Sequence, residues 1–232
     1  MELSTTNSSK QRLRSDSESL SLTSFLFDLD GTLVDSYGTI QSSVNYLRRG
    51  HGLPPLDLPT IHKAVGRGVG WLLEQTLPGC DPEVETPLYH RHHKAIIGRT
   101  KTLPGVRRTI KSLYRRGCRL GICSNKPLAL TQVLLAELKL EPLFEIVLGP
   151  ESVTQRKPAP DMIEVAQSRF GVDSDQVLYV GDMTIDIETA RAAGVPVWVI
   201  PTGSHDVERL REAKPDHIMT QFNELLSLVP RR

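Results

Sequence analysis

Short apolar runs alternate with helix-like segments along most of this 232-residue chain. Such runs need cover on both faces, which a parallel sheet flanked by helices provides. The pattern therefore predicts an α/β fold with a doubly wound parallel sheet. The expected strands are residues 25–29, 119–123, 145–148, 177–180 and 197–200. The expected helices are residues 105–117, 127–138, 160–170, 184–193, 206–213 and 221–228.

Residues 36–100 interrupt this alternation, because they contain helical patterns but no convincing strand. We interpret them as a helical insertion placed directly after the first strand, so that the core comprises residues 22–35 and 101–232. The helices expected in the insertion are 36–49, 58–65, 69–77 and 82–98.

Residues 1–21 are rich in Ser and Thr and lack the apolar segment of a secretory signal. We predict a disordered tail and a cytoplasmic protein. Three basic residues of the tail leave organellar targeting open, although its acidic residues are unusual for a transit peptide.

Charge and composition argue against several classes of partner. The 28 Lys and Arg residues nearly balance 27 Asp and Glu residues, and aromatic residues make up 5% of the chain. Neither a nucleic acid nor a membrane surface is therefore expected as partner, and no apolar run has the length of a membrane span. Three cysteines without metal-binding spacing indicate ordinary reduced thiols. The sequence leaves open whether the protein is a monomer or a homodimer.

Polar residues follow the apolar strands at the ends where ligands bind in open parallel sheets. The first strand is followed by Asp28 and Asp30, and the second by Ser124 and Asn125. The later strands are followed by Lys157, Asp182 and Asp186. We expect all of these side chains to meet at one edge of the sheet.

These residue types suit phosphoryl transfer to a carboxylate. Asp28 could attack phosphorus and form an aspartyl-phosphate, while the neighbouring Asp30 could act as general acid and base. So many carboxylates would repel a phosphate dianion, which implies a cation, and Mg²⁺ favours carboxylates, phosphate oxygens and water. Lys157, Ser124 and the backbone N–H groups of Asn125 and Gly31 could hold the phosphoryl group.

Four segments, DLDGTLVDS, SNKP, KPAPD and GDMTIDI, occur in this order. They resemble the four signature motifs of the haloacid dehalogenase superfamily of phosphohydrolases, which implies a Rossmann-like core. The resemblance implies that Asp28 is the nucleophile and Asp30 the general acid and base. It also implies that the Asp28 carboxylate, the Asp30 main-chain carbonyl and Asp182 bind Mg²⁺, with Asp186 supporting the site.

The insertion resembles the α-helical cap of one subclass of this superfamily. Its segment Gly66-Arg67-Gly68 is similar to the cap of phosphoglycolate phosphatases, which implies contact between this loop and a substrate carboxylate. A flexible turn between two helices is an equally good interpretation of the two glycines. His90, His92 and His93 lack a further metal ligand, and we expect them on a solvated helix face.

The resulting hypothesis is a Mg²⁺-dependent phosphatase acting on a small phosphorylated metabolite, with 2-phosphoglycolate as the first candidate. A pyrophosphatase, a sugar phosphatase or a β-phosphoglucomutase would share every core motif. A non-catalytic phospho-acceptor or scaffold domain is an alternative of a different class, although the position of the acidic pair on the first strand and the insertion after it argue against a receiver domain.

Overall fold

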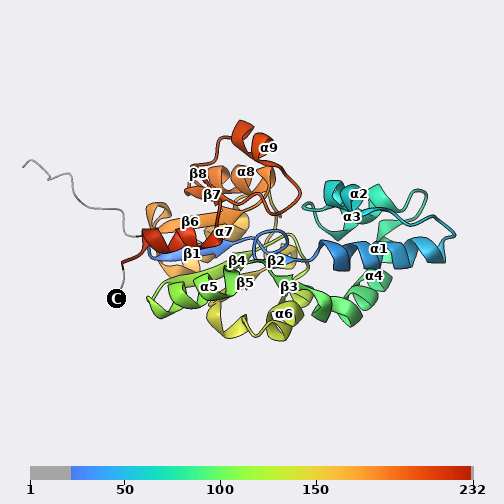
Figure 1. The fold of residues 1–232 in the computed structure, drawn as a ribbon, viewed down its shortest axis with the longest axis horizontal. Helices are drawn as coiled ribbons and strands as arrows, with labels where there is room; N and C mark the ends of the chain where they lie inside the picture. Colours follow the sequence, from blue (N-terminus) through green and yellow to red (C-terminus); the bar gives the residue numbers. More distant parts are fainter. Residues whose placement is uncertain (1–21, 231–232) are drawn as a thin grey trace, which may run out of the picture.

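A six-stranded parallel sheet forms the centre of the computed structural model, which describes residues 22–230 (Figure 1). The strand order is β5-β4-β1-β6-β7-β8, and every neighbouring pair is parallel. The strands are β1 (Ser24–Phe27), β4 (Arg119–Cys123), β5 (Ile146–Leu148), β6 (Val177–Gly181), β7 (Val197–Val199) and β8 (His217–Ile218). The predicted doubly wound α/β class is confirmed. The predicted tail, residues 1–21, lies outside the described residues.

Helices cover both faces of this sheet. They are α5 (Val106–Arg115), α6 (Leu128–Glu137), α7 (Asp161–Phe170), α8 (Thr184–Ala192) and α9 (Val207–Glu212). Phe25 and Phe27 of β1 pack with α5 and α6 on one face, whereas Leu26 packs with α7 and α8 on the other. Successive side chains of a strand point to opposite faces, so β1 contributes to two separate hydrophobic cores.

Two short features near the C-terminus differ from the prediction. Strand β8 has only two residues and was not expected, because a pattern of alternating side chains needs a longer run to be recognised. Residues 221–228 were expected as an ordinary short helix, but Phe222–Leu228 is a 3-10 helix that begins with a hydrogen bond from the N–H of Glu224 to the carbonyl of Gln221 (3.1 Å).

The insertion after β1 folds around its own hydrophobic cluster, and we call its four helices the cap. They are α1 (Tyr37–Gly50), α2 (Leu58–Ala64), α3 (Val69–Thr76) and α4 (Pro82–Ile96), all within two residues of the predicted bounds. Val44, Leu47 and Leu73 are among the buried residues at its centre. Figure 1 shows the cap as a lobe beside the sheet.

The segments that lead into the cap and out of it pair as two antiparallel strands. β2 (Val34–Asp35) pairs with β3 (Lys101–Thr102), and Val34 lies opposite Thr102. The sequence did not indicate these two-residue strands. They hold together the two crossings between core and cap, and therefore fix where the cap sits relative to the end of β1.

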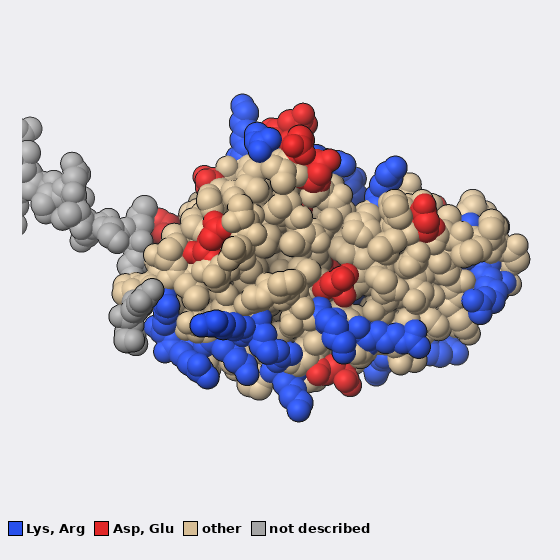
Figure 2. Space-filling view, in the orientation of Figure 1, with Lys and Arg blue, Asp and Glu red and all other residues tan. Residues whose placement is uncertain are grey.

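Basic side chains gather along one edge of the face drawn in Figure 2, over the position of α5 in Figure 1. Arg108, Lys111 and Arg115 of α5 are exposed there. Acidic side chains are scattered over the rest of this face. Among residues 22–230, no helix combines the length and the apolar character needed to cross a bilayer.

Candidate active site

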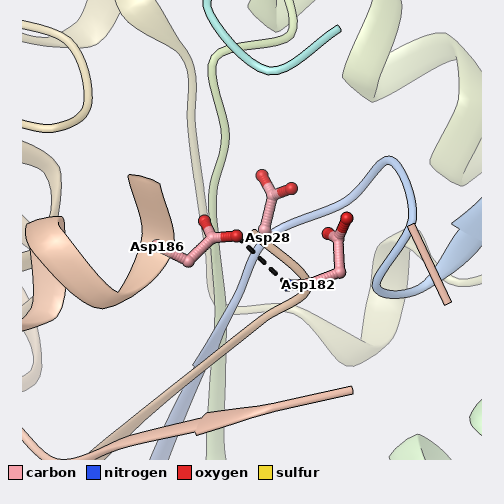
Figure 3. Close-up of side chains that lie close together, drawn as sticks. All are labelled: Asp28, Asp182 and Asp186. Atoms are coloured by element: carbon pink, nitrogen blue, oxygen red, sulfur yellow. Dashed lines mark hydrogen bonds between the residues drawn. The ribbon is translucent and has the colours of Figure 1, made fainter. Parts of the chain in front are cut away.

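Three buried aspartates form a cluster at the carboxyl end of the sheet (Figure 3). Asp28 follows β1, Asp182 follows the adjacent strand β6, and Asp186 lies in the first turn of α8. One oxygen from each carboxylate lies within 4.8 Å of the others. The predicted convergence of strand ends therefore brings these three side chains together, because β1 and β6 are neighbours in the sheet.

Asp186 is oriented by the backbone at the start of α8. Its Oδ2 accepts hydrogen bonds from the N–H groups of Asp182 (3.1 Å) and Met183 (2.9 Å). The dashed line in Figure 3 marks the first of these bonds. N–H groups at a helix start have no partner within the helix, so a carboxylate there is well stabilised.

Asp182 keeps one oxygen without a partner. Thr32 donates a hydrogen bond to Oδ1 (2.7 Å), whereas Oδ2 is buried and has no hydrogen-bond partner among the described residues. A Cβ on either Gly31 or Gly203 would overlap the Asp182 carboxyl group, so both positions have to lack a side chain.

Lys157 lies between two of the carboxylates. Its Nζ is 2.8 Å from Asp28 Oδ1, 2.7 Å from Asp186 Oδ1 and 3.1 Å from the hydroxyl of Tyr179. Burial alone would lower the pKa of Lys157, but the charges of Asp186 and Asp28 outweigh burial and hold that pKa well above the ordinary value. Lys157 therefore carries its positive charge inside the site.

The aspartates are costly to ionise together. Burial raises the pKa of Asp28 to about 6, against the attraction of Lys157, and the charge of Asp186 adds to the rise. Burial also raises the pKa of Asp182 well above its usual range, and the carboxylates of Asp186 and Asp28 raise it further. A divalent cation would offset this repulsion. The all-oxygen donor set and the unpartnered Oδ2 of Asp182 fit a hard ion such as Mg²⁺.

Asp30 points away from this cluster and toward a second lysine. Lys126 Nζ is 3.2 Å from both carboxylate oxygens of Asp30 and 3.4 Å from Nε2 of His93 in the cap. The predicted metal ligands therefore divide into two sets. The carboxylates of Asp28, Asp182 and Asp186 lie together, and the Asp30 side chain lies outside their cluster.

Lys126 was not predicted as a site residue, although its spacing from Ser124 could have indicated it. It is two residues after Ser124 at the end of β4, so alternation along the chain can place both side chains on the side of Asp28. Only 7% of the Lys126 surface is exposed. Such deep burial is rare for a lysine that has no charged partner. The ion pair with Asp30 supplies that partner.

The expectation of a solvated histidine face is wrong for His93. Its side chain is fully buried and stacks on Tyr89 with ring centroids 5.3 Å apart. Burial and the nearby charge of Lys126 lower the pKa of His93 to about 2. Glu85, Tyr89 and His93 are spaced four residues apart and all are buried, so α4 presents this face to the interior. The spacing of the histidines alone does not show that this face is buried.

Ser124 and Asn125 lie where they were predicted, but the Asn125 side chain is already engaged. Its Oδ1 accepts a hydrogen bond from the N–H of Lys157, and its Nδ2 donates to the carbonyls of Lys157 (3.1 Å) and Gly66 (3.0 Å). Asn125 thus ties the Lys157 loop to the cap. The buried hydroxyl of Ser124 lies near Asp28, whose pKa it lowers slightly against the effect of burial.

The loop between α2 and α3 contributes its glycines to the site. Gly66 and Gly68 both have positive φ (113° and 90°), which favours glycine, and both line the cavity over Asp28. Arg67 is exposed instead, and its guanidinium lies 5.3 Å from the ring centre of Trp71. It borders a neighbouring cleft that also contains His205.

Core and cap together line a small cavity over Asp28 that is open to solvent on one side. The core supplies the polar floor, which includes Asp28, Asp30, Ser124 and Lys126. The cap supplies an apolar wall of Ile40, Val65, Val69, Leu72 and Tyr89. Cys123 lies beneath this floor, and burial raises the pKa of its thiol to about 12, as expected for an unreactive thiol.

Comparison with known proteins adds independent evidence. The sequence matches the family described as haloacid dehalogenase-like hydrolase over residues 25–200. It is 36% identical over 192 residues to a plasmid-borne phosphoglycolate phosphatase of Cupriavidus necator, covering 80% of this chain and 83% of that protein. It is 32% identical over 212 residues to a phosphoglycolate phosphatase of Photorhabdus laumondii, covering 88% and 90%.

A solved structure agrees with the fold as well. The crystal structure of a predicted phosphoglycolate phosphatase from Haemophilus somnus superimposes with a TM-score of 0.81 at 26% identity, covering 90% of this chain and 98% of that one. Both lobes are therefore shared, because the match extends beyond the length of the core alone.

Proposed function

Because the chain belongs to the haloacid dehalogenase-like hydrolase family and is a phosphatase, we propose that it hydrolyses a small phosphomonoester through an aspartyl-phosphate on Asp28, with Mg²⁺ as cofactor. The observation that carries this proposal is the position of the Asp28 carboxylate. It lies beside Asp182, Asp186 and Lys157 at the floor of a cavity closed by the cap.

In the first step an Asp28 oxygen attacks phosphorus. A bond forms between this oxygen and phosphorus, and the bond from phosphorus to the ester oxygen breaks. Asp30, which borders the same cavity, supplies the proton that the leaving alkoxide needs. The Lys157 ammonium and the Ser124 hydroxyl hold the phosphoryl oxygens as charge moves onto them.

In the second step Asp30 takes a proton from water, which attacks phosphorus and releases Asp28. Phosphate leaves with the oxygen of that water, and Asp28 returns to a carboxylate. Mg²⁺ held by Asp28, Asp182 and Asp186 would neutralise charge on the phosphoryl group. The Asp30 main-chain carbonyl is the further ligand that the family motif implies.

The favoured substrate is 2-phosphoglycolate, because the named relatives act on it and the cavity is small. A pyrophosphate or a sugar phosphate could be attacked by the same core residues, and so could the substrate of a β-phosphoglucomutase. A non-catalytic phospho-acceptor or scaffold would not need the enclosed cavity. We further propose a cytoplasmic enzyme without a nucleic-acid partner.

Replacement of the nucleophile tests this function directly. Asp28→Asn should lower kcat on the order of 10⁴-fold or more, because the amide of asparagine cannot form the covalent intermediate. In an acid-quench experiment with labelled substrate, the wild-type protein should carry a covalent phosphoryl group that the variant lacks. Asp175→Asn, at an exposed aspartate, is the matched control. Substantial Mg²⁺-dependent turnover by Asp28→Asn would overturn the proposal.

A further inference from the structure

Lys126 is the only lysine or arginine that lines the catalytic cavity in the described part of the chain. Lys157 is not a lining residue, and its ammonium is bonded to Asp28 and Asp186 at the point where the phosphoryl group would bind. Arg67 borders the neighbouring cleft. An anionic group on the part of the substrate that leaves with the ester oxygen would therefore find one cationic side chain in the cavity, that of Lys126.

The hydrogen-bond partners of Lys126 account for all three of its ammonium hydrogens. Ser43 donates to the carbonyl of Thr39 (3.0 Å), so the two lone pairs of its oxygen accept the hydrogens on Nδ1 of His93 (3.1 Å) and Nδ1 of His92 (3.3 Å). Nε2 of His93 is then an acceptor, and it takes one hydrogen from Lys126. The other two hydrogens face the two oxygens of Asp30, each 3.2 Å away.

The ion pair with Lys126 engages the Asp30 carboxylate, which the reaction needs for proton transfer. Asp30 has to give a proton to the ester oxygen, but both of its oxygens accept hydrogens from Lys126 and carry no proton in this arrangement. Once Lys126 turns to another anion, Asp30 can take a proton from water and pass it to the leaving oxygen. A second carboxylate that binds Lys126 would compete for the same hydrogens. The cap would keep Lys126 in place during this exchange, because His93 is buried and fixed by Ser43 and Tyr89.

We propose that Lys126 binds a carboxylate of the substrate and thereby releases Asp30 for proton transfer. This inference rests on the proposed function and specifies its substrate class: phosphomonoesters whose carboxylate is one carbon from the ester oxygen. Asp30 and Lys126 are in direct contact, so the ester oxygen and the recognised carboxylate have to be neighbours in the substrate as well. A hexose phosphate has no carboxylate to place there, and the cap side chains Ile40, Val65, Val69 and Leu72 offer no partner for its hydroxyl groups.

The proposal changes the predicted role of the cap loop. From the sequence, Gly66, Arg67 and Gly68 were expected to contact the substrate. The two glycines remain at the cavity wall, but we assign carboxylate recognition to Lys126 of the core instead of Arg67. The cap then acts on specificity through His93, which positions Lys126.

A comparison of three esters with the wild-type protein tests the inference without any variant. The esters are 2-phosphoglycolate, ethyl phosphate, which has a methyl group in place of the carboxylate, and 3-phosphooxypropanoate, which places the carboxylate one carbon further away. We expect kcat/KM for 2-phosphoglycolate to exceed both others by about 100-fold, as for loss of a buried charge-assisted contact. Part of the difference should appear in kcat, because Asp30 remains bonded to Lys126 when the ester has no carboxylate.

The variant Lys126→Met then assigns the preference to this residue. The ratio of kcat/KM for 2-phosphoglycolate to that for ethyl phosphate should fall by about 100-fold, whatever the variant does to either rate alone. Lys126→Arg keeps the charge and should retain part of the ratio. Circular dichroism establishes that each variant is folded.

The outcomes separate this inference from the function on which it rests. Absence of Mg²⁺-dependent hydrolysis of every ester would overturn the proposed function. Hydrolysis with equal efficiency for 2-phosphoglycolate and ethyl phosphate would overturn the role of Lys126 alone. An unchanged ratio in folded Lys126→Met would do the same, because Lys126 would then act only on Asp30.

Discussion

At the scale of single residues, the site depends on the absence of side chains as much as on the acidic groups. The Asp182 carboxyl group fits only because Gly31 and Gly203 leave space for it. Gly31 also has positive φ (86°), so its replacement would strain the backbone. Gly203 has no such constraint, and a substitution there would act on the space around the Asp182 carboxyl group and, less closely, on the Tyr37 hydroxyl.

We predict that Gly203→Ala weakens Mg²⁺ binding. The new methyl group would displace the Asp182 carboxylate, and loss of ligand orientation commonly costs 10–100-fold in metal affinity. The Mg²⁺ concentration that gives half-maximal activity should therefore rise by roughly 10-fold or more. Gly38→Ala is the matched control, since nothing lies within 4 Å of a Cβ at that position. An unaltered Mg²⁺ dependence in Gly203→Ala would contradict this account of Asp182.

At the scale of elements, α4 links the cap to the chemistry of the core. Its inner face carries Glu85, Tyr89 and His93, all buried. His93 contacts the core residue Lys126 on one side and Ser43 of α1 on the other. One helix therefore takes part both in the packing of the cap and in the hydrogen bonds that hold Lys126 beside Asp30.

The buried imidazole predicts a pH dependence of stability. His93 stays neutral in the folded protein because burial, Lys126, His90 and His92 all lower its pKa, to about 2. In the unfolded chain it takes up a proton as the pH falls through about 6.5, so acid favours unfolding. Between pH 7.5 and 5.5 this single group should lower the free energy of unfolding by about 1.4 kcal/mol.

Urea unfolding of the wild-type protein and of His93→Gln at both pH values measures this contribution. The variant should lose about 1.4 kcal/mol less than the wild-type protein over the interval. Contributions from the other histidines cancel in the comparison. Equal losses would mean that His93 is not held neutral by its surroundings.

At the scale of the whole molecule, two packed units meet over the carboxylate cluster. The core has hydrophobic clusters on both faces of the sheet, and the cap has a third. The chain connects them through the paired strands β2 and β3, and the hydrogen bond from Asn125 to the carbonyl of Gly66 joins them across the cavity. We propose that the cap opens about the β2–β3 pair to admit substrate and release product.

Binding of Mg²⁺ should stabilise the entire protein, because the ligands come from separate segments that only folding brings together. At 100 times its dissociation constant the ion should add about 2.7 kcal/mol to the free energy of unfolding. For a chain of this size that corresponds to a rise in Tm of roughly 5–10 °C, measurable by scanning calorimetry with and without EDTA. Asp182→Asn should lose most of the rise, whereas Asp175→Asn should keep it. A full rise in Asp182→Asn would place the ion elsewhere.

The order of strands and helices, and the edge of the sheet that carries the chemistry, were determined by the sequence itself. Apolar runs and helical spacing are local properties, and the rule that parallel strands present their carboxyl ends to one edge needs no further information. Asp28, Ser124 and Asp182 could be placed near one another on that basis alone. The short strands β2, β3 and β8 could not be predicted, because two residues are too few to show an alternating pattern.

Only the tertiary structure decided which of these side chains touch. The pairing of Asp30 with Lys126 spans 96 positions, and the contact of Lys126 with His93 spans 33 positions between two separately packed units. The burial of His93, the engagement of Asn125 and the outward position of Arg67 follow from how the cap sits on the core. Contacts between side chains so far apart in the sequence depend on packing in three dimensions. Local patterns of residues therefore do not predict them.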